Sequence, residues 1–272
     1  MTVRSVFPSD GETLPLEGLY LHLNLHREAG EGEIHIYSNY VASLDGRISR
    51  FNPETGDYEV PKSLANERDW RLYQELAAQS DILVTSARYF RQLATGSAQD
   101  LLPVGSGFDD LKQWRLAQGL EAQPAVAILS RSLDIPVEVL EQLGERTIYV
   151  MTSATAPADK RAELESQGVA VMTAGDVDVE GRALRRVLIA LGFRSAYMIA
   201  GPQVHSTLIE AKVLDALFLT TRFTLMGSEE SHGLCEGALS MPHVMQLQKL
   251  YLDEVGEQMF AHYGLKRDVE RS

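Results

Sequence analysis

The strand-to-helix turn within residues 199–212 has the residue types and spacing of an anion-binding site. Its sequence, IAGPQVHSTLIEAK, passes from an apolar strand to a helix at Gly201 and Pro202. Glycine lets a backbone approach a ligand closely, and proline is tolerated in the first turn of a helix. The unpaired N–H groups of that turn and the helix dipole bind phosphate or pyrophosphate, and polar side chains within 203–207 add donors. The alternative is an ordinary strand-to-helix connection, because one glycine is weaker than a full Gly-rich fingerprint.

Two further segments follow predicted strands and carry polar residues that suit a ligand. SLDGR, residues 43–47, places Asp45 and Gly46 at the end of the first core strand, and ligands of open α/β sheets collect at the carboxyl ends of strands. TSARYFRQ, residues 85–92, has two arginines including Arg88, and guanidinium groups bind phosphate oxygens in a fork. The alternatives are an Asp-Gly bend for the first segment and a solvent-facing helix surface for the second.

Signatures of several other enzyme classes are absent from the sequence. It has no G-x-S-x-G nucleophile elbow, no P-loop and no G-x-G-x-x-G after a strand, so hydrolase, kinase and typical Rossmann functions lack support. His22 and His26 have the i, i+4 spacing of a helical metal pair, but no third ligand stands at a recognisable offset. We therefore predict no metal site.

The elements that must position these segments alternate between strands and helices. Hydrophobic periodicity predicts strands over 33–46, 80–86, 124–130, 147–153, 169–175, 195–201 and 214–227, helices over 63–80, 87–94, 156–168, 179–193 and 202–213, loops over 94–107 and 227–242, and a hairpin over 244–265. This order predicts an α/β fold, with a mostly parallel sheet flanked by helices and a C-terminal antiparallel hairpin. One domain, residues 34–272, follows an N-terminal extension, residues 1–33, which could cover a sheet edge or part of a dimer interface.

Composition excludes several kinds of partner. The 38 acidic and 25 basic residues give a net charge of −13, and binding to the phosphate backbone of nucleic acids needs a basic face. The single cysteine, Cys235, cannot form an internal disulfide or a Cys-rich zinc site. No apolar run approaches the ~20 residues of a membrane helix, and the N-terminus lacks the apolar stretch of a signal peptide. We expect a cytoplasmic protein with no nucleic-acid or membrane partner.

Three segments, in their order along the chain, resemble the pyrimidine reductase family of riboflavin biosynthesis, which includes the C-terminal reductase domain of the bifunctional deaminase-reductase. VASLDGRIS and SDILVTSARYF are similar to the family's first strand and turn and to its next strand-to-helix connection. LGFRSAYMIAGPQVHSTLIEAK and the strand that follows are similar to the family's Gly-Gly-Pro block. The resemblance runs from about residue 34 to 227 and implies a dihydrofolate-reductase-like fold. The chain length suits a stand-alone member with no fused deaminase.

The resemblance also implies an activity, a cofactor and partners. Members of this family transfer a hydride from NADPH to a ribosylaminopyrimidinone phosphate, so a phosphorylated pyrimidine or a related substrate and a homodimer are expected here. Carried over by position, the cofactor-binding residues are Asp45, Gly46, Ser86, Ala87, Gly201, Pro202, Gln203, Val204, His205 and Ser206, and the substrate-binding residues are Ser43, Arg47 and Arg88. No catalytic side chain is assigned, because the cofactor supplies the hydride.

Three positions depart from the family's pattern. Ile199 stands where the family has a glutamate, and Tyr89 replaces a threonine and would crowd a small phosphate pocket. Ala77 stands where the family has a substrate-binding arginine. These departures predict an altered way of binding the substrate, a different substrate or a loss of catalysis. The alternative to a reductase is therefore a non-catalytic relative that binds a nucleotide or a protein partner.

Overall fold

The computed structural model describes residues 1–8, 11–98, 102–144, 146–227, 230–235 and 239–265. Parts of the predicted loops, and residues 266–272 of the predicted domain, lie outside this set. The strands are β1 (Thr2–Phe7), β2 (Thr13–Pro15), β3 (His35–Ser43), β4 (Arg47–Asn52), β5 (Asp57–Glu59), β6 (Ile82–Ser86), β7 (Ala125–Leu129), β8 (Ile148–Thr152), β9 (Ala170–Thr173), β10 (Ser195–Met198), β11 (Ala216–Arg222), β12 (Ser231–Gly233), β13 (Met245–Asp253) and β14 (Gln258–Leu265). The α-helices are α1 (Glu67–Ala78), α2 (Ala87–Ala94), α3 (Asp109–Ala117), α4 (Val137–Leu140), α5 (Ala158–Ser166), α6 (Gly181–Ala190) and α7 (Pro202–Glu210), with 3-10 turns η1 (Leu21–Leu23), η2 (Leu25–Arg27) and η3 (Glu141–Leu143).

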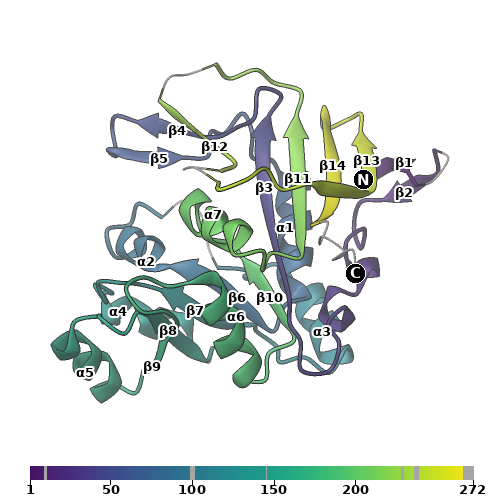
Figure 1. Cartoon of the computed structure of the whole chain (residues 1–272). Helices are drawn as coiled ribbons and strands as arrows, with labels where there is room; N and C mark the ends of the chain where they lie inside the picture. The colour runs from purple at the N-terminus through teal and green to yellow at the C-terminus, as the bar shows by residue number, and fades with distance from the viewer. Residues whose placement is uncertain (9–10, 99–101, 145, 228–229, 236–238, 266–272) are drawn as a thin grey trace.

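A large sheet organises the molecule, with the strand order β2-β1-β13-β14-β11-β3-β10-β6-β7-β8-β9 (Figure 1). The neighbouring strands from β11 to β9 all run parallel, whereas β14, β13, β1 and β2 pair antiparallel. The predicted α/β class, the mostly parallel sheet and the C-terminal hairpin are therefore confirmed. None of the helices in the described ranges has the length and apolar character of a membrane span.

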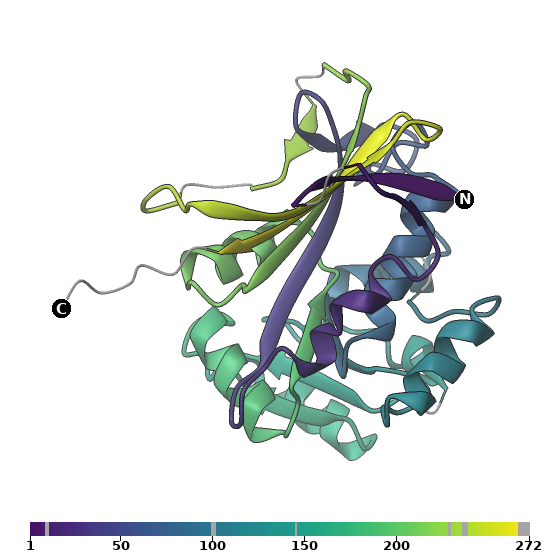
Figure 2. The same cartoon turned by 90° about the vertical axis from the view of Figure 1, so that its right-hand side faces the viewer.

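Alternating side chains on the parallel strands build two hydrophobic cores, one on each face of the sheet. Tyr37 and Leu83 belong to the core that α1 to α5 cover, whereas their neighbours Ile36 and Val84 belong to the core under α6 and α7. Figure 2 shows the sheet between these two layers. Because both faces are covered, the central strands are apolar on both sides, as expected for parallel sheets.

The N-terminal segment, residues 1–33, is part of the large sheet. Its strand β1 pairs with β13, and β2 forms the edge. Polar side chains at the C-terminal end of α1 hold the chain that follows β2. The buried Glu75 carboxylate accepts hydrogen bonds from the backbone N–H groups of Gly18 (2.6 Å) and Tyr20 (3.0 Å). One turn later, just past the end of α1, the amide oxygen of Gln79 accepts a hydrogen bond from the Leu25 N–H at 2.9 Å. The backbone of this segment thus finds its partners in the helix that covers the core.

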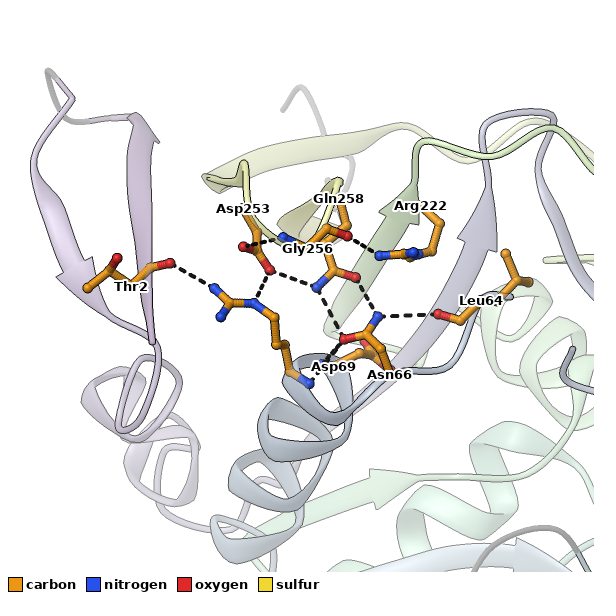
Figure 3. Close-up of polar contacts among 9 residues, drawn as sticks. Thr2, Leu64, Asn66, Asp69, Arg222, Asp253, Gly256 and Gln258 are labelled. Carbon is orange, nitrogen blue, oxygen red and sulfur yellow. Dashed lines mark hydrogen bonds and ion pairs between the residues drawn. The ribbon is translucent and has the colours of Figure 1, made fainter. Parts of the chain in front are cut away.

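A polar network fastens the start of α1 to the C-terminal hairpin (Figure 3). The fully buried Asp253 carboxylate accepts a hydrogen bond from Arg68 Nε at 2.5 Å and from the Gln258 amide at 2.8 Å. Gln258 in turn accepts a hydrogen bond from the amide of Asn66, the residue that caps α1, and Arg68 also donates to the Thr2 carbonyl at 2.8 Å. The network places the first turn of α1 beside the C-terminal end of β11, where the hairpin turn lies.

Besides β1, β2, α4 and the 3-10 turns, two parts of the fold were not predicted from the sequence. One is α3, for which no element was expected between the predicted loop and the strand at 124–130. The other is a separate antiparallel sheet, β12-β4-β5, which follows the turn at the end of β3 and lies above α2 and α7 in Figure 1. Two of its strands have three residues each, and β12 lies within the predicted loop 227–242, so neither gives a periodic signal.

We predict that Glu75→Ala lowers the free energy of unfolding by about 3–5 kcal/mol, because removing one partner leaves buried polar and charged groups without compensation. Arg71 also pairs with Glu75, with 2.9 Å between the nearest side-chain atoms. The matched control is Glu163→Ala on the exposed surface of α5, where a change within about 0.5 kcal/mol is expected. Urea unfolding followed by circular dichroism measures both, and equal losses would contradict the role given to Glu75.

Candidate functional site

The order of the strands creates a switch point at the C-terminal ends of β10 and β6, which we call the crevice because open α/β sheets bind ligands at such points. The chain builds β3, β6, β7, β8 and β9 outward in one direction, then returns to insert β10 between β3 and β6. Right-handed crossovers consequently place α2, which follows β6, on one face and α7, which follows β10, on the other. Ligands of open α/β sheets bind where neighbouring connections diverge in this way. The structure thus brings two of the predicted segments, 199–212 and 85–92, to adjacent strand ends.

The start of α7 has the features of an anion-binding turn. Gly201 precedes the helix, no side chain caps the first turn, and Pro202 is its first residue. A Cβ atom added at Gly201 would meet no other atom within 4 Å, so open space lies beside this backbone. The N–H groups of Gln203 and Val204 have no partner earlier in the helix, as for any helix start. The Tyr40 hydroxyl donates a hydrogen bond to the Ala200 carbonyl at 3.2 Å, which ties the turn to β3.

His205 and Ser206, two of the residues predicted to bind a cofactor here, form hydrogen bonds within the protein. His205 is fully buried, with Nδ1 3.1 Å from the Leu234 carbonyl and its ring 4.7 Å from the ring of Tyr40. Burial lowers the pKa of His205 to about 4, and the Leu234 carbonyl only partly opposes this shift. The Ser206 hydroxyl donates to the Pro202 carbonyl within the helix, at 2.9 Å. Both side chains thus have partners within the protein, and the backbone N–H groups of the first turn are the donors that point to a ligand; the predicted cofactor contacts of His205 and Ser206 stay predictions.

The turn after β3 is a structural clamp. The Asp45 carboxylate accepts hydrogen bonds from the hydroxyl of Ser43 (2.6 Å) and from the backbone N–H groups of Met226 (3.0 Å) and Gly227 (2.9 Å). These bonds, the one from Ser43 foremost, hold the pKa of Asp45 well below its usual range. Gly46 has φ +76°, a left-handed conformation that favours glycine. The clamp joins the ends of β3 and β11, so Ser43 and Asp45 shape the site, and their predicted ligand contacts stay predictions.

The start of α2 is joined to the small sheet by an ion pair. Ser86 precedes the helix without capping it through its side chain, and Ala87 is buried. The guanidinium group of Arg88 pairs with the Asp57 carboxylate of β5, which also accepts a hydrogen bond from the Gln92 amide. Arg88 was predicted to bind substrate, but in this structure its guanidinium group forms an ion pair with a carboxylate of the protein. The pair fixes the small sheet over α2.

Arg47 is the predicted substrate residue whose surroundings best suit a ligand. It begins β4 and is half-buried, directly after the clamp turn. Its Nε is buried and has no hydrogen-bond partner within the described part of the chain. A buried donor without a partner is costly, so an anion beside Arg47 would remove that cost.

The three departures from the family pattern lie in different places. Ala77 is fully buried in the last turn of α1, at the end of that helix away from the network around Asn66, so the loss of an arginine there takes nothing from this crevice. The position of Ala77 therefore gives no support to the inference that it weakens this site. Ile199 and Tyr89, in contrast, flank the crevice and pack against the core under α1 to α5. They put apolar surface where the family has a carboxylate and a small hydroxyl.

Other contributors to the crevice gave no motif in the sequence. Tyr40 supports the Ala200 carbonyl, and the Tyr197 hydroxyl donates to Asn39 at 2.5 Å across β10 and β3. Their positions depend on strand pairing, although Asn39 and Tyr197 do lie on predicted strands, 33–46 and 195–201. Among the described residues, no group of three or more His, Cys, Asp or Glu side chains is arranged to hold a metal ion.

Comparison with known proteins agrees with this fold. The model of the RibD C-terminal domain family matches residues 34–260. The chain therefore belongs to the RibD C-terminal domain family. A curated relative, the 2,5-diamino-6-ribosylamino-4(3H)-pyrimidinone 5′-phosphate reductase of Archaeoglobus fulgidus, is 26% identical over 205 residues, which are 75% of this chain and 86% of the relative.

Solved structures share the fold at low sequence identity. A pyrimidine reductase-like protein from Corynebacterium diphtheriae has a TM-score of 0.69 and 17% identity, covering 94% of this chain and 100% of that one. The riboflavin biosynthesis reductase of Saccharomyces cerevisiae has a TM-score of 0.61 and 14% identity, covering 92% and 99%. At these identities the likeness concerns the fold, and it confirms the fold that the sequence resemblance implied.

We predict that acid destabilises the fold in part through His205. The unfolded chain takes up a proton near pH 6.5, whereas the buried imidazole resists protonation down to about pH 4. Stability is therefore lost as the pH falls between these values, by up to about 3 kcal/mol from this residue. His205→Asn keeps a donor for the Leu234 carbonyl but does not titrate. Urea unfolding at pH 7 and at about pH 4.5 should show a smaller loss in the variant; equal losses would refute this assignment.

Proposed function

We propose that this protein is an NADPH-dependent reductase that acts on a phosphorylated ribosylaminopyrimidine. The observation that carries the proposal is the uncapped start of α7 with open space at Gly201, in a chain whose residues 34–260 match the family of riboflavin-pathway reductases. The relative from Archaeoglobus fulgidus is itself named as a reductase of such a phosphate. These facts support an oxidoreductase more strongly than any other class of protein.

The residues of this chain fit the cofactor through backbone groups. The N–H groups of Gln203 and Val204, which have no partner within α7, and the dipole of this helix would hold the pyrophosphate. The start of α2 at Ser86 follows the neighbouring strand and faces the same crevice. When bound, NADPH supplies the hydride that, with a proton, reduces the imine form of the substrate's sugar. The protein binds and orients the two molecules, and Arg47 would bind the substrate phosphate.

A non-catalytic relative is the second candidate, and two residues favour it. Ile199 and Tyr89 place apolar side chains where the family pattern has groups that contact its ligands. Titration of the protein with NADPH, monitored through nicotinamide fluorescence, tests cofactor binding, which both candidates allow. Loss of nicotinamide absorbance with the ribosylaminopyrimidinone phosphate separates them: turnover supports the reductase, and binding without turnover supports the relative. No binding at millimolar NADPH would reject the reductase. The homodimer and the cytoplasmic location stay predictions.

We predict that Gly201→Asp abolishes NADPH binding without loss of stability. An aspartate before α7 would cap the helix and interact well with its dipole, while its charge would repel the pyrophosphate. Gly201→Asn is the matched control, because it has the same shape and capping ability without the charge. We expect the Asp variant to bind at least about tenfold more weakly than the Asn variant, which corresponds to 1.4 kcal/mol. Equal affinities in fluorescence titrations would move the cofactor site elsewhere.

We predict that Arg47→Gln raises the KM for the phosphorylated substrate by about 10- to 100-fold, the range expected when a hydrogen bond to a charged group is lost. Arg50→Gln is the matched control: it removes the same charge from the same strand, at an exposed position. We expect its KM to stay within about threefold of the parent value, since exposed charges contribute little. Steady-state kinetics at saturating NADPH measures both. Similar KM values for the two variants would remove Arg47 from the substrate site.

A further inference from the structure

A second candidate site lies at the opposite edge of the parallel strands. A cavity of about 490 Å³ opens there between the segments that precede β6, β7, β8 and β10, and its lining includes Asp81, Arg115, Arg146 and Arg194. This volume is within the range of small-molecule sites, roughly 300–1,000 Å³. Strand β6 separates the cavity from the crevice by five residues, or about 16 Å at 3.3 Å per residue. In Figure 1 the helix that carries Arg115, α3, lies away from α7 and the small sheet.

Arg115 is the deepest of the three arginines and has only carbonyl partners. Its side chain is almost fully buried, and Nη1 donates to the carbonyl groups of Ala78 at 3.0 Å and Ser80 at 2.7 Å, just past the end of α1. Its Nε donates to the Glu121 carbonyl at 2.7 Å. The negative end of the α1 dipole accounts for one cation at this place. It does not account for the two further arginines of the cavity.

Arg146 and Arg194 repeat this kind of contact. Arg146 donates to the Pro103 carbonyl at 2.6 Å, and Arg194 donates to the Ala29 carbonyl at 2.7 Å. No ion pair joins any of the three arginines to a carboxylate within the described ranges, whereas Arg68 has one such pair and Arg71 has two. In a chain with a net charge of −13, a cavity that keeps three unpaired guanidinium groups is a distinct feature.

The acidic residues of the lining, Asp81 and Glu121, form no ion pair with these cations within the described ranges, although their charges favour the charged form of Arg115. The Asp81 carboxylate accepts hydrogen bonds from the backbone N–H groups of Arg194 (2.8 Å) and Ser195 (2.9 Å), and Glu121 is exposed. Burial lowers the pKa of Arg115 to about 10, although Asp81 and Glu121 partly oppose this shift, and burial lowers the pKa of Arg146 to about 10 as well. Both groups stay charged at neutral pH, so a bound anion would offset the cost of burying them.

An aromatic wall completes the cavity and narrows the class of ligand. The rings of Tyr149 and Phe193, both half-buried, meet edge to face with centroids 5.7 Å apart. Aromatic edges and faces pack against planar rings, and guanidinium groups bind phosphate oxygens in a fork. We propose that this cavity binds a nucleoside monophosphate, with the phosphate on Arg146 and Arg194 and the base against Tyr149 and Phe193.

The test uses adenosine 5′-monophosphate as the probe and isothermal calorimetry as the measurement. Because the crevice at α7 would also bind this probe, the titrations are made in Gly201→Asp protein, which removes that site if the proposed function holds. We expect binding in this background, weakened at least about tenfold by Arg146→Gln and by Arg194→Gln. The matched control is Arg186→Gln, which removes one charge from the exposed surface of α6 outside the cavity and should leave affinity unchanged.

Further titrations test whether the cavity binds both the phosphate and the nucleoside of the ligand. Adenosine should not bind, and inorganic phosphate should bind more weakly than the nucleotide. The proposal is overturned by the absence of binding at millimolar nucleotide, by equal affinity for inorganic phosphate, or by affinity that Arg146→Gln and Arg194→Gln leave unchanged. This inference does not rest on the proposed reductase. Failure of Gly201→Asp to affect NADPH binding would count against the crevice, whereas the arginine variants report on the cavity alone.

Discussion

The insertion of β10 between β3 and β6 is the constraint on which the rest of the structure depends. Because parallel strands need crossover connections and these are right-handed, the outward and returning halves of the chain must cover opposite faces of the sheet. As a result β10 and β6 are neighbours whose following helices, α7 and α2, lie on opposite faces of the sheet. The crevice exists because of this order of strands, and the types of side chain around it decide what can enter.

Much of the polar side-chain chemistry near the crevice serves the scaffold. Asp45 joins the ends of β3 and β11, and Arg88 joins α2 to the small sheet. What remains for a ligand is backbone N–H groups at the start of α7 and the partly buried Arg47. Such a site suits a cofactor that carries its own reactive atom, because the protein then needs to supply position and charge more than a reacting side chain.

The sequence predicted the parallel strands and the helices that flank them because most of these elements are long enough to show a hydrophobic periodicity. The Gly-Pro turn before α7 and the Asp-Gly turn after β3 were also located, since turn chemistry is local. Roles that depend on distant partners were not predictable. Arg88 was expected to meet a phosphate, but its partner Asp57 lies on a strand too short to recognise. Ala77 was expected in the site, but α1 begins near the C-terminal ends of the strands and runs away from them, so Ala77 lies at the opposite end of the helix.

The central position of β3 also bears on how the chain acquires its structure during synthesis. Both strands that flank β3 come from the last third of the chain: Tyr37 pairs with Tyr197 on one side and with Ala216 on the other. Closing such long loops is slow, and contacts of high sequence separation are made late. The first strand of the core must therefore leave the ribosome and wait, with its apolar side chains unpaired, until residues beyond 222 have been made. The N-terminal segment and α1 are made before the partners of β3. The hydrogen bonds between that segment and the end of α1 can therefore form early and cover one face of β3, which reduces its tendency to aggregate.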